Sequence, residues 1–319
     1  MRIGTIKILS WANLDQNLFS NVKPSGDIVG KVDKGVAKEL GLGKSVIAVT
    51  GGHDQPCGAL GAGVLSEGIA MNATGTSDTT AVALKKPLIN DLMLSNNYPC
   101  YNHVPKNTYI ITAFNLTGGL LLRWYRDTLC KEEIREAKNA RRDVYELIIE
   151  RASTEPASTF ILPHFVGSGT PTMDSRSKGA ILGLTLGTTK ADLSKAVLDS
   201  LCYEMRINLD TLKGIGVDVE EIRIIGGGAK SKIWSQLKAN IYGIRVVSLE
   251  VSEAACLGAA ILAGTAIGCF SSIHSAVNKM VRVREIFYPC RRELERYIEK
   301  YQIYRKIYPQ LAKLNHEMN

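Results

Sequence analysis

This 319-residue chain has no apolar segment long enough to cross a membrane. A membrane-spanning helix requires about 18 or more apolar residues in succession. The first apolar stretch, residues 3–8, is already interrupted by Lys7, and no later stretch reaches that length. We therefore expect a soluble, unsecreted protein that has no membrane partner.

Paired cysteines are also absent. The seven cysteines are scattered along the chain, odd in number and nowhere arranged as C-x-x-C. Disulfide frameworks and zinc sites require recurrent close spacings, whereas scattered free thiols are typical of a reducing compartment. The sequence therefore predicts a cytoplasmic protein without a disulfide framework and without a metal site built from its own side chains.

Acidic residues are outnumbered, with 31 Asp and Glu against 39 Lys and Arg, which gives a net charge of +8. Much of the basic excess lies in residues 123–151 and 282–313, where Lys and Arg alternate with Glu at helical spacing. Such faces are usually solvated helices with intrahelical ion pairs. Nucleic-acid binding requires clustered cations interleaved with aromatic side chains. We therefore expect no nucleic-acid partner, and attraction for an anionic nucleotide instead.

What the chain does contain is an alternation of short apolar runs and amphipathic stretches, separated by glycine-rich turns. This alternation predicts a mixed α/β architecture, and the length suits two domains of ordinary size. Strands are predicted at residues 46–49, 68–73, 80–84, 109–114, 160–163, 179–186, 221–225 and 244–249. Helices are predicted after residue 54 and at residues 120–129, 131–151, 190–213, 232–242, 254–266 and 291–314.

The most informative segment is residues 46–55, in which an apolar run ends in Gly51 and Gly52 and then presents Asp54. The apolar residues predict a buried strand, and the glycines allow a sharp turn where it stops. Open α/β sheets bind ligands at the carboxyl ends of their strands, so Asp54 is a candidate for chemistry. Asp before an apolar helix is equally typical of an N-cap. The residues alone leave both alternatives open.

Three further glycine-containing turns can bring backbone N–H groups close to phosphate oxygens. Residues 74–77 stand between two predicted strands, whereas residues 118–119 and 226–228 each join a strand to a helix. The positive N-terminal end of a helix suits an anion. Taken singly, each turn is better explained as a turn only, because most glycines between a strand and a helix serve to reverse the chain. Residues 58–63 are also glycine-rich, but they lie within a predicted helix and indicate close helix packing.

The longest motif consists of GAILGL at residues 179–184 and, seven residues later, DLSKAVLD at residues 192–199. It resembles the second signature of the FGGY family of carbohydrate kinases. Residues 51–55, 75–77 and 226–229 resemble that family's catalytic segment, phosphate loop and adenine-side loop.

The resemblance extends from about residue 13 to about residue 266. It implies the actin-like, ribonuclease-H-like ATPase fold and transfer of the γ-phosphoryl group of MgATP to a hydroxyl of a sugar or polyol. ATP and Mg²⁺ are thus the implied cofactors. Asp54 would be the general base, with His53, Asp54 and Gln55 contacting the sugar. Nucleotide contacts are implied at Gly75, Thr76, Ser77, Gly119, Arg123, Gly227, Gly228, Ala229 and Lys232.

Two neighbours of Asp54 have simpler explanations. A histidine that packs or bonds to its own loop is a better interpretation of His53 than a substrate ligand. Cys57 stands one helical turn after Asp54, where a buried structural thiol is a better interpretation than a nucleophile.

The resemblance also divides the chain. Residues 1–66 match a remnant of the family's N-terminal lobe, residues 67–268 its C-terminal nucleotide-binding lobe, and residues 269–319 a helical C-terminal extension. Most sugar contacts belong to the part of the N-terminal lobe that this chain lacks. The resemblance therefore implies weak or no activity for this chain alone, with a homodimer or a separate N-terminal lobe as partner. A non-catalytic nucleotide-binding module of the same fold is the alternative. The sugar stays open, with the xylulose type preferred.

Overall fold

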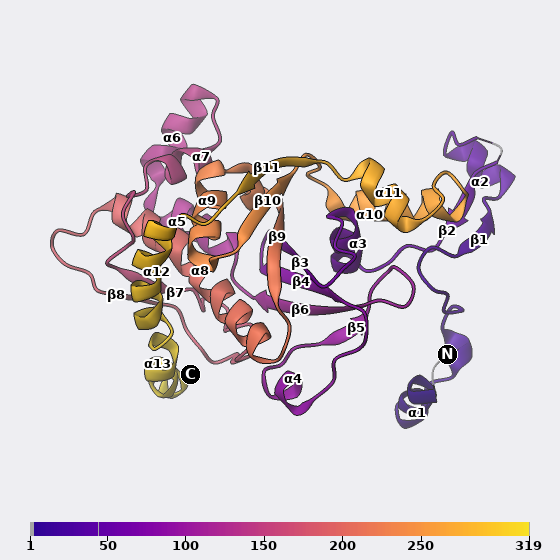
Figure 1. Cartoon of the computed structure of the whole chain (residues 1–319), viewed down its shortest axis with the longest axis horizontal. Coiled ribbons are helices and arrows are strands. Elements are labelled where there is room, and N and C mark those ends of the chain that lie inside the picture. The colour runs from indigo at the N-terminus through magenta and orange to yellow at the C-terminus, as the bar shows by residue number, and fades with distance from the viewer. Residues whose placement is uncertain (1–2, 44, 319) are drawn as a thin grey trace.

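In the computed structural model, which describes residues 3–43 and 45–318, a seven-stranded mixed sheet forms the centre of the molecule (Figure 1). Its strand order is β11-β10-β9-β3-β4-β6-β5. Strands β3, β9 and β10 are mutually parallel, whereas the pairs β10–β11, β3–β4, β4–β6 and β5–β6 are antiparallel. The strands are β3 (Gly68–Thr74), β4 (Asp78–Leu84), β5 (Cys100–Asn102), β6 (Tyr109–Asn115), β9 (Val219–Gly226), β10 (Arg245–Leu249) and β11 (Val283–Phe287).

Both faces of this sheet are buried, as the two core clusters show. Successive residues of a strand point to opposite faces. Ala70 of β3 belongs to the core cluster on one face and Met71 to the cluster on the other. Helices α5 (Gly119–Leu129), α8 (Lys190–Gly214) and α9 (Lys232–Tyr242) cover the Ala70 face. On the Met71 face lie α3 (Asp54–Gly61) and, beside it, α10 (Ala254–Ala266). The predicted α/β architecture is therefore confirmed.

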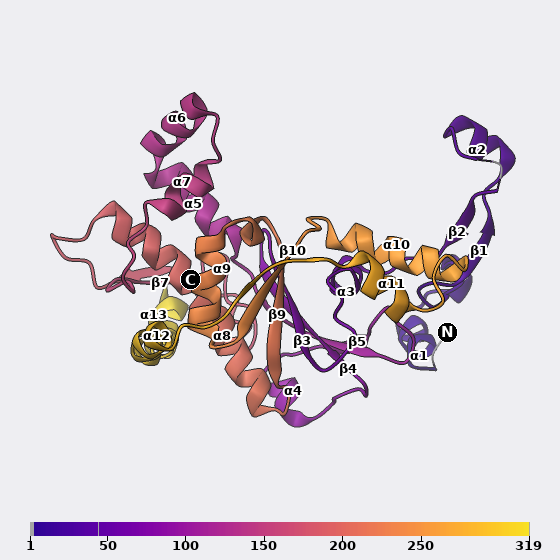
Figure 2. The ribbon, with the colours of Figure 1, turned by 45° about the horizontal axis from the view of Figure 1, so that its top comes forward.

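The remaining elements of residues 67–318 connect or flank this sheet. Figures 1 and 2 show the α6–α7 pair and the α12–α13 pair at the end of the molecule opposite β1 and β2. They are α4 (Asp91–Ser95), α6 (Lys131–Ala140), α7 (Val144–Glu150), β7 (Phe160–Leu162), β8 (Ala180–Leu182), η2 (Gly227–Lys230), α11 (Ile273–Met280), α12 (Arg291–Tyr304) and α13 (Ile307–Glu317).

Helices α3 and α10 are in backbone contact. A Cβ atom added at Gly61 would lie 1.8 Å from the carbonyl oxygen of Ala254. One added at Gly258 would lie 1.9 Å from the carbonyl oxygen of Cys57. Only glycine permits this approach, so the interpretation of close helix packing is confirmed at Gly61, whereas Gly58 faces Met71 of β3 and Gly63 faces Arg223.

The segment before α3 forms an arm that projects from one end of the molecule (Figure 2). It contains α1 (Ile3–Trp11), η1 (Gln16–Leu18), β1 (Ile28–Lys31), α2 (Lys34–Glu39) and β2 (Ile47–Val49). Strand β2 pairs antiparallel with β1 in a separate two-stranded sheet.

The prediction of a buried strand at residues 46–49 is wrong. Ile47 and Ala48 are exposed and Val49 is half-buried. In the described part of residues 6–50, Ala37 is the single buried side chain. An apolar run allows a strand to be buried, but burial requires other elements to pack on its two faces. Strand β1 pairs with one edge of β2 and does not cover its faces.

Two predicted long helices are each divided in two. Arg141 adopts a left-handed conformation with φ 53°, which ends α6, and the Asp143 carboxylate caps the N-terminus of α7. The predicted helix at 291–314 breaks at Arg305 and Lys306, between α12 and α13. Residues 269–319 are not helical throughout, because β11 pairs with β10 in the main sheet. The first interruption carries neither the Gly nor the Pro that marks a helix end in a sequence, whereas Pro309 in the first turn of α13 marks the second one.

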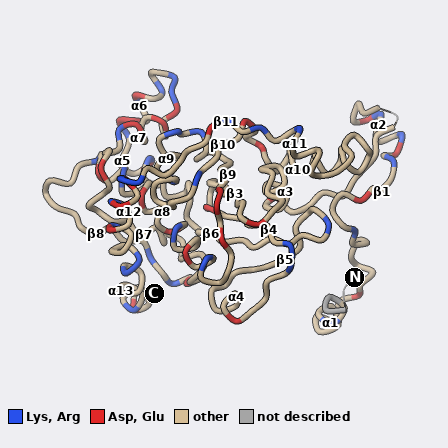
Figure 3. Tube along the Cα trace, in the orientation of Figure 1, with Lys and Arg blue, Asp and Glu red and all other residues tan. Residues whose placement is uncertain are grey.

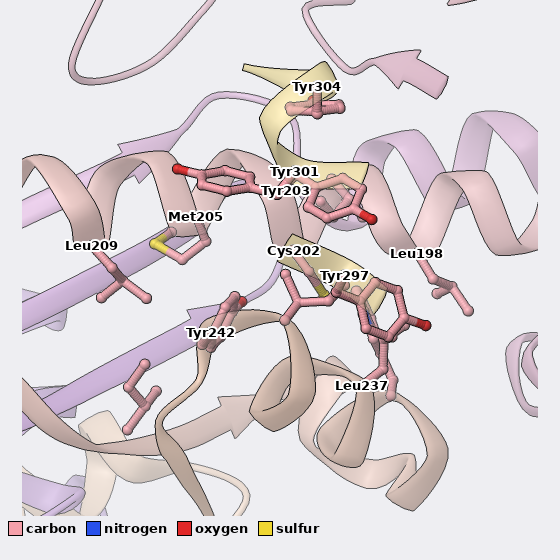
Figure 4. Close-up of a cluster of buried hydrophobic side chains, with 14 of the residues drawn as sticks. Leu198, Cys202, Tyr203, Met205, Leu209, Leu237, Tyr242, Tyr297, Tyr301 and Tyr304 are labelled. Atoms are coloured by element: carbon pink, nitrogen blue, oxygen red, sulfur yellow. The ribbon is translucent and has the colours of Figure 1, made fainter. Parts of the chain in front are cut away.

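Helix α12 is fixed to α8 by tyrosines (Figure 4). Tyr297, Tyr301 and Tyr304 are each at most 2% exposed and surround Tyr203 of α8. Their hydroxyls contact polar groups of α8; the Tyr304 hydroxyl, for example, donates to Glu204 Oε1 across 2.8 Å. The C-terminal helices thereby support the face of the sheet that carries α8 and α9.

Candidate functional site

Two of the three glycine turns and the helix after the third meet around one pocket of about 420 Å³. Its walls are the β3–β4 turn, the first turn of α5, helix α7, and η2 with the start of α9. Six of the residues predicted from the sequence line it: Gly75, Thr76, Gly119, Arg123, Gly227 and Gly228.

The β3–β4 turn rests directly on the N-terminus of α5. The N–H groups of Gly118 and Gly119 donate to the carbonyl oxygens of Thr76 and Gly75, across 3.0 and 2.7 Å. A Cβ atom at Gly118 would lie 2.4 Å from the Ser77 carbonyl carbon. These glycines are therefore required by the approach of two backbones. The α5 amides are also occupied by the turn.

The 226–228 turn packs against the other side of Thr74. Gly226 has φ +80°, and a Cβ atom there would lie 2.8 Å from the Thr74 carbonyl oxygen. A Cβ atom at Gly228 would meet the Thr74 Cβ at 3.0 Å and the Trp234 ring at 3.1 Å. A Cβ atom at Gly227 would meet nothing within 4 Å, so this glycine borders open space.

The pocket carries charges of both signs. Arg123 and Lys230 are its cationic lining residues, and Asp143 and Glu146 its acidic ones. Figure 3 shows basic and acidic residues close together around α5, α6 and α7. Asp143 accepts the N–H of Tyr145 across 2.7 Å, so its carboxylate is engaged in capping α7.

Helix α7 is held as a wall of the pocket by Arg126 of α5. Arg126 Nη1 donates to the Tyr145 hydroxyl across 2.7 Å, and its guanidinium lies 5.0 Å from the ring centroid. The sequence does not indicate that Asp143, Tyr145 and Glu146 line a pocket, because it predicts one continuous helix over residues 131–151. Lys230, Ser231 and Trp234 directly follow the Gly226–Gly228 turn, and that position was the available signal.

Three predicted nucleotide-side residues lie outside the lining of this pocket. Ser77 accepts the N–H of Gly75 through its carbonyl, 2.9 Å away, and shapes the turn. Ala229 packs against the main core. Lys232 Nζ pairs with Glu285 Oε2 of β11 at 2.8 Å and borders a different cavity.

Asp54 is the first residue of α3, and His53 is the N-cap. Asp54 Oδ1 accepts the N–H of Gln55 across 2.7 Å and lies 3.0 Å from His53 Nδ1. Both side chains are 71% exposed, so His53 is not packed. Among the residues that the structure describes, Asp54 thus bonds to its two immediate neighbours, and it does not occupy the N-cap position. None of His53, Asp54 and Gln55 lines the pocket.

Cys57 is 3% exposed, directly beneath this helix start. Burial raises the pKa of its thiol, and the nearby Asp54 carboxylate raises that pKa further. The thiol therefore stays protonated at neutral pH, which supports its interpretation as structural. All seven cysteines are free, as predicted.

In residues 3–43 and 45–318, no group of three His, Cys, Asp or Glu side chains is placed to hold a metal ion. Among the same residues, no helix is long and apolar enough to cross a membrane.

The mixed sheet with helices on both faces is the actin-like, ribonuclease-H-like fold, as comparison with solved structures shows. Ligand-bound xylulose kinase from Lactobacillus acidophilus aligns with a TM-score of 0.85 at 20% identity, covering 98% of this chain and 61% of that one. Glycerol kinase from Plasmodium falciparum with ADP aligns with a TM-score of 0.77 at 18% identity, covering 95% and 61%.

Residues 70–267 match the model of the FGGY family of carbohydrate kinases, C-terminal domain. The chain therefore belongs to the FGGY family of carbohydrate kinases.

Curated relatives share more of the sequence. Xylulose kinase of Staphylococcus epidermidis is 31% identical over 304 residues, which are 95% of this chain and 59% of the relative. Glycerol kinase of Borreliella afzelii is 30% identical over 294 residues, which are 89% of this chain and 56% of the relative. The chain thus spans less than two thirds of the length of these relatives.

Proposed function

We propose that the pocket binds ATP or ADP and that the chain supplies the nucleotide-binding part of an ATP-dependent carbohydrate kinase. The observation that carries this proposal is the convergence of glycine-rich backbone from three chain segments on one pocket of about 420 Å³. Small-molecule sites are typically about 300–1,000 Å³, so a nucleotide fits. In this proposal residues 67–268 form the nucleotide-binding lobe.

Several of the predicted residues have a role in this proposal. Gly75 and Thr76 receive the phosphates from the exposed turn, because glycine lets an anion approach the main chain. Arg123 of α5 and Lys230 of η2 offset phosphate charge from two different walls of the pocket. Gly227 leaves open space in the lining and suits the flat nucleoside part. Ser77 and Ala229 act through the shape of their turns.

Asp54 is proposed as the general base that accepts the proton of the attacking hydroxyl, and His53 and Gln55 as its neighbours on the sugar side. Gln55 Oε1 is buried and has no hydrogen-bond partner among the described residues, so it is available to a polar ligand. When bound, MgATP supplies the phosphoryl group and neutralises charge on it. Mg²⁺ usually keeps water and phosphate ligands and needs few from the protein.

The same geometry argues for weak activity in this chain alone. A positioned general base contributes about 10²–10⁴ in rate. Correct positioning of the reactants is worth more, roughly 7–11 kcal/mol of the barrier. The Asp54 side chain is 71% exposed and outside the pocket, so it keeps only the smaller contribution.

The acceptor is proposed to be a sugar or polyol, with a xylulose-type sugar preferred, since xylulose kinases are among the relatives. The exposed apolar side chains of the arm, among them Trp11, Leu18 and Ile47, favour a protein partner. We propose a homodimer or a separate polypeptide corresponding to the N-terminal lobe. A cytoplasmic location stays a prediction.

A non-catalytic nucleotide-binding module of the same fold is the second candidate. The observation that favours it is the separation of Asp54 from the pocket lining. The two candidates differ in turnover, not in nucleotide binding.

The binding test is titration of ADP into the purified chain. We expect a dissociation constant below about 1 mM. Gly227→Leu places a side chain in the open space of the pocket without a clash and should abolish binding. Gly214→Leu, at another glycine with nothing within 4 Å, is the matched control and should bind ADP as before. ADP binding that Gly227→Leu leaves intact would refute this site.

The turnover test combines the chain with ATP and xylulose, gluconate or glycerol. We expect rates far below the range of about 1–100 s⁻¹ that is typical of kinases. Turnover within that range would show that the exposed Asp54 is sufficient. Complete absence of turnover together with ADP binding would favour the non-catalytic module.

A further inference from the structure

A buried polar network lies beneath the β3–β4 turn, outside the pocket itself. Its centre is Lys238 of α9, which is 1% exposed. Lys238 Nζ donates to Thr74 Oγ1 across 2.6 Å and to Asn72 Oδ1 across 2.7 Å. It also lies 5.1 Å from the ring centroid of Trp234.

The network continues to Asp78 at the opposite end of the turn. Asp78 is 2% exposed, and its Oδ1 accepts from the Thr74 hydroxyl across 2.7 Å and from Asn72 Nδ2 across 3.0 Å. Lys238 and Asp78 are therefore joined through two shared neutral groups. Thr74 ends β3 and Asp78 begins β4, so this network closes the base of the turn that exposes Gly75 and Thr76.

Burial of these groups is costly unless every polar atom has a partner. Hydrophobic side chains of similar volume would fill the same space without the desolvation penalty of buried polar groups. The network also reaches two lining residues of the pocket, since Thr74 and Trp234 both border it. Lys238 thus contacts the pocket wall from behind at two points without lining the pocket.

We propose that Lys238 is a positioning residue, which holds the Thr74–Asp78 turn in the conformation that receives the phosphate groups of a nucleotide. This inference rests on the proposed nucleotide site. Both hydrogen bonds of Lys238 go to the base of the β3–β4 turn, at the phosphate end of the site. Loss of Lys238 should weaken binding of ADP and leave binding of adenosine, which has no phosphate, nearly unchanged.

A matched control separates positioning from simple support of the fold. Lys195 of α8 is 5% exposed, and its Nζ contacts Asp199 and, across 2.7 Å, the Tyr297 hydroxyl. It is a second buried lysine with carboxylate and neutral partners, but it lies away from the pocket. Lys195→Met should destabilise the chain as Lys238→Met does, without changing the preference for ADP over adenosine.

The experiment measures dissociation constants of ADP and adenosine by titration calorimetry on the full chain, for wild type, Lys238→Met and Lys195→Met. We expect Lys238→Met to reduce the ADP-over-adenosine preference by about tenfold, because a charge-assisted support is lost. Lys195→Met should keep the wild-type ratio. Equal weakening of both ligands by Lys238→Met, or an unchanged ratio, overturns the positioning role.

If Lys238→Met does not fold, Asn72→Ala decides the question. It removes one acceptor of Lys238 Nζ and one donor to Asp78, and Asn72 does not line the pocket. We expect Asn72→Ala also to reduce the preference for ADP over adenosine, by a smaller factor than Lys238→Met does. Wild type that binds neither ligand would refute the nucleotide site and this inference together. Wild type that binds ADP, with an unchanged ratio in Asn72→Ala, would refute the inference alone.

Discussion

Gly119 donates its backbone N–H to the carbonyl oxygen of Gly75 across 2.7 Å, and this contact joins two of the glycine turns that the sequence presents far apart. A Cβ atom at Gly119 would lie 2.6 Å from that oxygen. The two glycines thus form one unit in the lining of the pocket.

Gly119→Ala should separate the turn from α5. Overpacking of this kind costs about 1–3 kcal/mol, because backbone atoms must move. We expect a lower free energy of unfolding in urea and weaker ADP binding by calorimetry. Gly187→Ala is the control, since its Cβ would meet its nearest neighbour at an ordinary 3.8 Å. Unchanged ADP affinity in Gly119→Ala would mean that the turn is not part of the binding site.

Asp54→Asn should remove the proposed general base. We expect a loss of about 10²–10⁴ in any turnover of ATP with xylulose, and unchanged ADP affinity, since Asp54 does not line the pocket. Turnover is followed by release of ADP, and affinity by calorimetry. Asp33→Asn, which changes an exposed carboxylate that caps α2 in the arm, should leave turnover unaltered. Loss of ADP binding in Asp54→Asn would indicate a structural role for Asp54.

The sequence predicts elements best where the chain carries local signals. Helices α9 and α10 have the predicted bounds; α9 begins after Ser231, whose hydroxyl accepts the N–H of Trp234, and ends at Gly243 in a left-handed conformation. These are the ordinary start and stop signals of a helix. Strand β11, by contrast, was missed, because its residues do not alternate between buried and exposed, with Phe287 alone buried, and its partner β10 lies more than 30 residues away.

In the site, too, local signals can be recognised in the sequence and tertiary contacts cannot. The glycine turns are visible in the sequence, but their convergence depends on the strand order, which places β3 between β9 and β4. The direction of Lys232 depends on the rotation of α9 about its axis, and β11 supplies its partner Glu285. The wall formed by α7 depends on the left-handed Arg141, a conformation that no glycine marked. Local patterns therefore predict which residues are special, and tertiary contacts decide which of them meet.

Acid should destabilise the fold through His103. This side chain is 5% exposed, and its Nε2 lies 3.0 Å from the Val64 carbonyl oxygen, to which the neutral ring donates. Burial lowers the pKa of His103 to about 4, although the bond to Val64 opposes that shift. In the unfolded chain histidine binds a proton near pH 6.5, so the unfolded state gains protons first as the pH falls.

The stability conferred by neutral His103 is therefore fully present above pH 6.5 and is lost progressively between pH 6.5 and about 4. The loss amounts to roughly 3 kcal/mol at most. His103→Gln keeps a donor for Val64 and does not titrate, so its free energy of unfolding should fall less over this range. Urea unfolding at a series of pH values measures the difference. His274→Gln, at an exposed histidine, should retain the wild-type slope.

Gly258→Ala should disrupt the contact between α10 and α3, because its Cβ would lie 1.9 Å from the Cys57 carbonyl oxygen. Neither helix backbone can move without disturbing the cluster that contains Leu60 and Ile261. We expect the free energy of unfolding to fall by about 1–3 kcal/mol or more. Ala260→Ser, on the exposed side of α10, should change the free energy of unfolding by less than about 0.5 kcal/mol.

Because α3 also carries Asp54, Gly258→Ala should lower any turnover with little change in ADP affinity. Equal losses of both would show that the α3–α10 contact supports the whole sheet rather than the Asp54 end of α3.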